Sequence, residues 1–216
     1  AHWYTKGTYV TSGEMQKTIH DFYGFPQELF EVEYPAKGNP ELTKETAELL
    51  APTSVIETDS WGLDHGAWSV IKHLYPAANI PVIQMSIDYT QPAQYHFDLA
   101  KKLQKLREKG ILIIGSGNVV HNLRMIDWKN INTVGAGWDW AIEARAKTNE
   151  WILDGNFQNL IHFEKQGAAL QNAIPTPDHY LPLIYTLGLK EKSDNISLFN
   201  DELIGGSLSM TSVFVG

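Results

Sequence analysis

Residues 111–121 read ILIIGSGNVVH: an apolar run, a glycine-rich turn and then a histidine. Four apolar residues without alternation, Ile111 to Ile114, are typical of a strand buried on both faces of a sheet. Ile80 to Ile87 is a second, mostly apolar run of this kind. The segment between them begins at Pro92 and carries leucines at helical spacing. This alternation of strands and helices predicts an α/β fold.

The same reasoning extends along the rest of the chain. Asn39 and Pro40 supply a cap and a first-turn proline for a helix that ends near Leu50. We expect further helices at 66–74, 92–110, 138–153 and from Thr176, and strands at 8–11, 54–58, 80–87, 111–114 and 207–215. No repeat or linker interrupts them. The prediction is a single α/β domain over residues 1–216, with a central mixed sheet flanked by helices on both faces.

The net charge and the cysteine content limit which kinds of molecule the protein is expected to bind. The chain has 216 residues, no cysteine and a formal net charge of -8. The negative charge argues against nucleic acid and against anionic membranes, and the missing cysteines exclude disulfides and thiolate metal sites. With no long apolar run and no export signal in the sequence, we expect a cytoplasmic protein.

Histidines occupy the positions where α/β folds bind ligands. Ligands bind outside the carboxyl ends of the strands, and His2, His65 and His121 each follow an expected strand. His179 lies in the first turn of the helix expected after Thr176, where the helix N-terminus disfavours a positive ring. Local sequence also allows ordinary alternatives: a ragged terminus, a polar turn, a surface position and a solvent-facing capping turn, respectively.

The remaining local signals leave the chemistry open. His20 sits in an aromatic loop and could reach a pocket, and Asp64 could fix the tautomer of an imidazole. The glycine turn is neither a dinucleotide fingerprint, since Val120 replaces the third glycine, nor a hydrolase elbow. The residues by themselves indicate an α/β protein with histidines directly after its strands, a pattern that is compatible with a mononuclear metal site.

Six motifs in order resemble the class III extradiol ring-cleavage dioxygenases, in their DOPA 4,5-dioxygenase branch. They are AHW (1–3), TIHDFYGFP (18–26), WGLDHG (61–66), GSGNVVHNL (115–123), PTPDHYLP (175–182) and GSLSM (206–210). Family members begin with a further strand and a histidine-bearing turn. We therefore expect that N-terminal strands, with one more metal ligand, are missing from this sequence.

The resemblance implies a reaction and a set of roles. His2 and His179 are expected to ligate one divalent metal, Fe(II) for activity, with Zn(II) able to occupy the same ligands. His121 is expected to be the active-site base or an additional ligand, His65 to steady negative charge on the substrate, and His20 to line the pocket. The substrate would be a catechol such as DOPA, opened with O2.

Two other functions fit the same sequence. One is a non-catalytic, partner-binding protein of the same fold. The other is a zinc-dependent hydrolase, which needs an acidic general base where the motifs supply histidines. Oxygen uptake with catechols distinguishes the dioxygenase from both.

Overall fold

The computed structural model describes residues 3–216, and these fall into two compact units. The first ends at Gln91 and the second runs from Pro92 to Gly216. Each unit is described by itself. None of the helices formed by residues 3–216 combines the length and apolar character of a membrane span.

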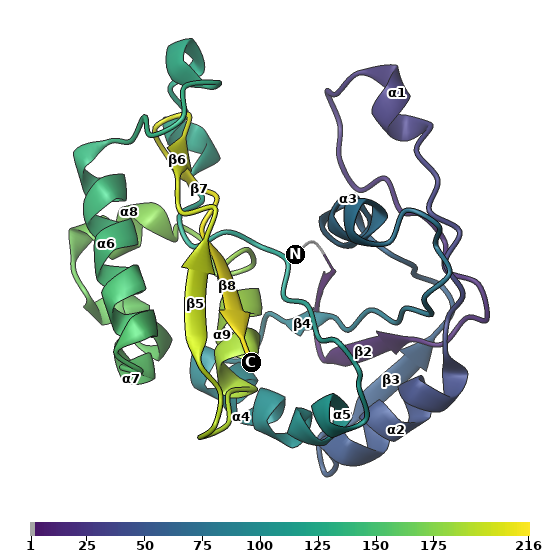
Figure 1. Ribbon diagram of the computed structural model, residues 1–216. Helices are drawn as coiled ribbons and strands as arrows, with labels where there is room; N and C mark the ends of the chain where they lie inside the picture. The colour runs from purple at the N-terminus through teal and green to yellow at the C-terminus, as the bar shows by residue number, and fades with distance from the viewer. Residues whose placement is uncertain (1–2) are drawn as a thin grey trace. The chain divides into compact units, whose positions relative to one another are not determined.

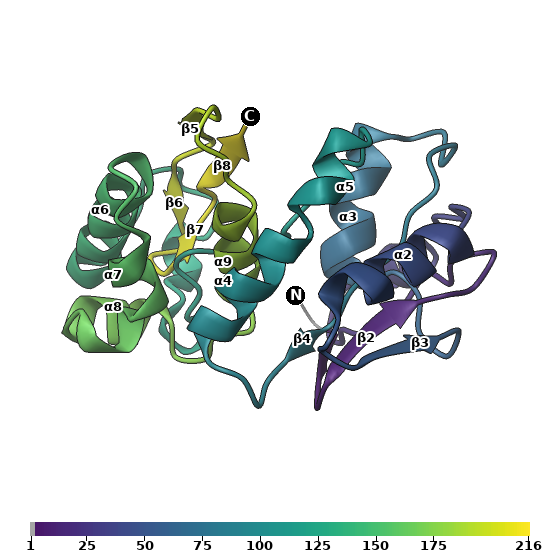
Figure 2. The ribbon, with the colours of Figure 1, turned by 90° about the horizontal axis from the view of Figure 1, so that it is seen from below.

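The first unit is built from two parallel strand pairs and three helices (Figure 1). Its elements are β1 (Tyr4–Thr5), β2 (Thr8–Thr11), α1 (Gln27–Phe30), α2 (Pro40–Leu50), β3 (Val55–Thr58), α3 (His65–Leu74) and β4 (Ile87–Asp88). β1 pairs with β4 and β2 with β3. Helix α2 lies along β2 and β3 in both ribbon views (Figures 1 and 2), and Thr43 Oγ1 donates a 2.7 Å hydrogen bond to the carbonyl of Thr11. As expected, the Asn39 side chain caps α2, accepting from Leu42 N at 3.0 Å.

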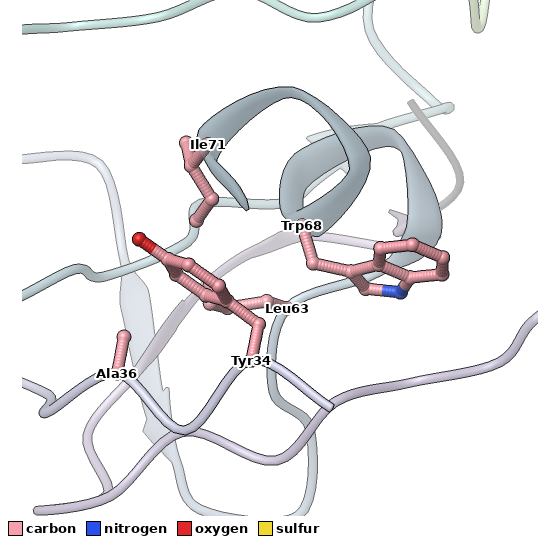
Figure 3. Packing of buried hydrophobic residues seen from close by; sticks show 5 residues of the cluster. All are labelled: Tyr34, Ala36, Leu63, Trp68 and Ile71. Atoms are coloured by element: carbon pink, nitrogen blue, oxygen red, sulfur yellow. The ribbon is translucent and has the colours of Figure 1, made fainter. Parts of the chain in front are cut away.

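A small apolar cluster fixes α3 in the first unit (Figure 3). It consists of Tyr34, Ala36, Leu63, Trp68 and Ile71, all buried. The Tyr34 hydroxyl donates to the carbonyl of Tyr75, just beyond the end of α3, at 2.9 Å. Trp68 Nε1 donates to the carbonyl of Ile19 at 3.0 Å. The cluster therefore ties α3 to the segment that carries His20 and the aromatic residues after it.

The second unit holds most of the helices and two antiparallel strand pairs. Its α-helices are α4 (Ala93–Lys102), α5 (Gln104–Glu108), α6 (Asp139–Leu153), α7 (Phe157–Ile161), α8 (Ala168–Ala173) and α9 (Leu181–Gly188), with short 3-10 turns at Leu123–Met125, Trp128–Asn130 and Phe163–Lys165. Strand β5 (Ile196–Phe199) pairs with β8 (Ser212–Val215), and β6 (Leu203–Ile204) with β7 (Leu208–Ser209). Helices α4 and α9 pack together, and fully buried His96 hydrogen-bonds through Nδ1 to the Tyr185 hydroxyl at 3.0 Å.

The α/β class is confirmed, and both parallel and antiparallel pairings occur. The strands described lie in four two-stranded pairs instead of one continuous central sheet. The prediction of a buried strand at 111–114 is wrong, because these residues lie outside every ladder and Leu112 is 61% exposed. The run from Ile80 contributes only its end, as β4. A strand forms only where another segment hydrogen-bonds to it. An apolar run does not specify that partner segment.

Candidate functional site

The histidines of two distant motifs meet within the second unit. The rings of His121 and His179 stack, with centroids 3.7 Å apart and planes 9° apart. Backbone hydrogen bonds hold both residues: His121 N donates to the carbonyl of Ala173, and Asn118 N donates to the carbonyl of His179, each at 2.9 Å. This stack is the centre of the candidate site.

Two glycines allow the close approach that creates the stack. A Cβ at Gly117 would lie 2.1 Å from the carbonyl oxygen of His179. At Gly115 it would lie 2.4 Å from that of Pro182, in the first turn of α9. Both distances are too short for any side chain. The glycine turn therefore serves backbone packing and brings residues 115–121 against the segment that carries His179.

A carboxylate orients His179. Asp178 Oδ2 lies 2.6 Å from Nδ1 of His179. Burial raises the pKa of Asp178, but hydrogen bonds from His179 and Thr176 outweigh it and hold that pKa well below its ordinary value. An ionised carboxylate can only accept a hydrogen bond, so Nδ1 carries the proton and Nε2 is the nitrogen that can bind a metal.

The structure corrects the expected setting of His179. It does not lie in the first turn of a helix that follows Thr176, because α9 begins at Leu181. The preceding residues form a turn in which the backbone nitrogens of Tyr180 and Leu181 both donate to the carbonyl of Pro177. A proline at the start of α9 favours helix initiation there. The carboxylate of Asp178, and not a helix terminus, contacts the ring.

The pair fits a divalent metal ion in donor type, because imidazole nitrogen is a common ligand of iron and zinc. Rings in parallel planes do not aim their in-plane lone pairs at one point. The stack therefore suits one ligand with a second imidazole beside it. Among residues 3–216, no three His, Cys, Asp or Glu side chains gather as a complete ligand set. His2, the other expected ligand, lies outside the described residues.

His65 belongs to the first unit, where it begins α3. Its backbone nitrogen and Nδ1 lie 3.0 and 2.9 Å from Oδ1 of Asp21. Burial raises the pKa of Asp21, but the hydrogen bonds and charge of His65 outweigh it and lower that pKa from 3.8 to about 2. Asp64 caps α3, accepting from Ala67 N at 2.9 Å. It also accepts from Trp3 N at 3.1 Å.

His20 lies in an aromatic cluster of the first unit. Its Nε2 is 2.9 Å from the carbonyl oxygen of Val32, and its ring lies about 6 Å from those of Phe22, Phe30 and Trp68 (5.9, 6.3 and 5.9 Å between centroids). The loop residue Tyr23 beside the cluster is 91% exposed. His20 is thus engaged with backbone and aromatic rings, and its substrate-binding role stays a prediction.

Sequence reasoning missed the two carboxylates that orient the histidines. Asp178 had a local signal, since it directly precedes His179 within a turn between prolines. Asp21 had none, because it acts on a residue 44 positions away.

Comparison with known proteins places these features in a family. Residues 1–211 match the family described as the catalytic LigB subunit of aromatic ring-opening dioxygenase. The chain is 43% identical to "4,5-DOPA dioxygenase extradiol" of Escherichia coli K12, over 100% of this chain and 80% of that protein. It is 32% identical to the protein of the same name from Beta vulgaris, over 98% of this chain and 79% of that protein.

A solved structure agrees with this. A crystal structure of an uncharacterized Escherichia coli K12 protein matches with a TM-score of 0.81 and 38% identity, covering 98% of this chain and 82% of the other. The chain therefore belongs to the aromatic ring-opening dioxygenases of the catalytic LigB family, the class III extradiol enzymes.

Proposed function

We propose that this enzyme opens the ring of a catechol, with DOPA or a related catecholic acid as substrate, using O2 and one divalent metal ion. The observation that carries the proposal is the His121–His179 stack, in which Asp178 leaves Nε2 of His179 as the metal-binding nitrogen. The named relatives support DOPA as the first substrate to test.

The metal would be held by His179 and His2, with Fe(II) for activity and Zn(II) able to occupy the same nitrogens. When bound, the ion acidifies the diol and carries electrons between the ring and O2. Asp178 keeps the ring of His179 in one tautomer and orientation, as carboxylate partners of metal-binding histidines do.

His121 is proposed as the base. It lies against the ring of His179, so a diol bound beside that ring can pass its remaining proton to the imidazole of His121. The parallel stack supports this role over that of an additional ligand. His65 and His20 of the first unit keep their proposed roles, steadying substrate charge and lining the pocket, respectively.

Oxygen consumption tests the function directly. Full-length protein, loaded anaerobically with Fe(II), is given DOPA, other catechols and, as a matched control, a 1,4-diol that cannot chelate a metal. We expect one O2 consumed per catechol, with a new yellow ring-opened product and no uptake with the 1,4-diol. Absence of uptake at confirmed metal content would overturn the proposal in favour of a non-catalytic protein. Hydrolysis without oxygen uptake would favour a zinc hydrolase.

A further inference from the structure

We infer that Asp21 is a positioning residue that holds the Nδ1 proton of His65 and thereby makes Nε2 the nitrogen that acts on the substrate. The link to turnover rests on the proposed function. The link to the tautomer stands on the first unit alone and can be measured without any substrate.

One oxygen of Asp21 binds His65 twice. Oδ1 accepts from the backbone nitrogen of His65 at 3.0 Å and lies 2.9 Å from its Nδ1. Because both donors belong to one residue, the carboxylate fixes the ring relative to its own backbone. The two side chains are 14% and 30% exposed for Asp21 and His65, so the contact is largely shielded from water.

The charge of Asp21 decides which ring nitrogen carries the proton. Its pKa is lowered to about 2, so the carboxyl is ionised at neutral pH. An ionised carboxylate has no proton to donate, and Nδ1 must therefore be the donor in this contact. The neutral ring is held as the Nδ1–H tautomer, and any proton that the ring gains or loses is exchanged at Nε2.

Phe22, the residue after Asp21, contacts the ring of His65 from a second side. Phe22 meets His65 edge to face, with centroids 5.3 Å apart and planes 86° apart. Phe22 is itself packed against Phe30, at 4.8 Å, and Trp68, at 6.2 Å. Trp68 belongs to the buried cluster of Figure 3. Neighbouring residues of one loop thus set both the tautomer and the tilt of the ring, anchored to the core.

This arrangement suits transfer or sharing of a proton at Nε2. A ring whose Nδ1 is bound to a carboxylate can donate from Nε2 to a developing oxyanion when protonated, with Asp21 stabilising the positive charge. When neutral, the same ring can accept a proton at Nε2. Donation depends on the negative charge of Asp21 beside the protonated ring. Acceptance depends on the Nδ1–H tautomer, because the other neutral tautomer carries an N–H at Nε2, where a lone pair is required.

Imidazole nitrogen-15 NMR tests the inference on the full-length protein. The signals of His65 are identified by their loss in His65→Gln and followed from pH 6 to 9. We expect the wild-type neutral ring as Nδ1–H and a mixture of tautomers in Asp21→Asn. Asp98→Asn is the matched control, because that carboxylate also accepts from side chains but is 56% exposed in its ion pair with Lys101. A wild-type Nε2–H ring, or an unchanged tautomer in Asp21→Asn, would overturn the inference.

Kinetics separates positioning from general stability. We expect kcat of Asp21→Asn to fall about 10- to 100-fold, in the range seen for carboxylates that orient working histidines. KM should stay near wild type, the melting temperature should fall by no more than about 4 °C, and Asp98→Asn should match wild type throughout. If Asp21→Asn does not fold, Asp21→Glu, which keeps the charge, should retain the Nδ1–H ring. Unchanged kcat in a folded Asp21→Asn contradicts the role. Lack of oxygen uptake by wild type refutes the proposed function and leaves the tautomer result standing.

Discussion

The imidazole rings of His121 and His179 lie in nearly parallel planes, 9° apart, with their centroids separated by 3.7 Å. The two residues come from motifs 58 positions apart (179 − 121) and are joined by backbone hydrogen bonds between residues 118–121 and the segments around Ala173 and His179. The two rings have different proposed roles, and these can be tested separately.

His179→Ala should remove the metal and leave the protein folded. The ring contributes a proposed ligand nitrogen, while the backbone contacts of residue 179 do not depend on its side chain. We expect at least about a tenfold loss of bound iron, measured by elemental analysis of Fe(II)-loaded protein alongside circular dichroism. His73→Ala, at an exposed position of α3, is the control. Normal iron content in His179→Ala would refute its assignment as a ligand.

Asp178→Asn should weaken metal binding without abolishing it. The amide can present either an acceptor or a donor to Nδ1 of His179, so the tautomer with Nε2 ready for the metal is no longer enforced. We expect about a 10- to 100-fold loss of affinity, measured by competition with a chelator. Wild-type affinity in a folded Asp178→Asn protein would show that the 2.6 Å contact is irrelevant to the metal.

His121→Ala should keep the metal and substrate binding but lose turnover. Removing a general base typically costs about 10²- to 10⁴-fold in rate. Iron content, anaerobic catechol titration and oxygen uptake should be measured on the same sample. Loss of iron would instead make His121 an additional ligand, and near-normal turnover would exclude both roles.

Gly117→Ala should destabilise the second unit and perturb the site. The new Cβ would lie 2.1 Å from the carbonyl oxygen of His179, so one backbone segment has to move. We expect about 1–3 kcal/mol less free energy of unfolding, as for other overpacked positions, and weaker metal binding. Urea unfolding measures the first and chelator competition the second. Wild-type protein is the reference, and a Gly117→Ala protein as stable as wild type would contradict the close approach.

The Asp21–His65 contact should make stability depend on pH at the acid end. The folded-state pKa of Asp21 is about 2, below the ordinary value of 3.8. The contribution is therefore complete above about pH 5 and is lost as pH falls through about 2. The free energy of unfolding should differ between wild type and Asp21→Asn by on the order of 1 kcal/mol at pH 7, allowing for partial exposure. Urea unfolding at pH 7, 4 and 3 should show that difference shrinking, and a difference that grows towards low pH would have the wrong sign.

Several local features were predictable because short stretches of sequence encode them. The cap at Asn39 and the strand Thr8–Thr11 were confirmed, as was the helix ending at Leu153. These depend on side-chain capping, backbone preference and spacing within a few residues. The strand expected at 111–114 failed because strand formation depends on a neighbour that no local pattern specifies.

By itself, the sequence determined the α/β class, the order of the motifs and the histidines on which chemistry could depend. Only the tertiary structure decided which carboxylate serves which ring: Asp21 for His65, across 44 residues, and Asp178 for His179, through the turn before α9. It also showed that Asp64, adjacent to His65, caps α3. The reason is physical. A hydrogen bond requires atoms about 3 Å apart in a fixed direction, and backbone packing sets that distance and direction, whereas proximity in sequence does not.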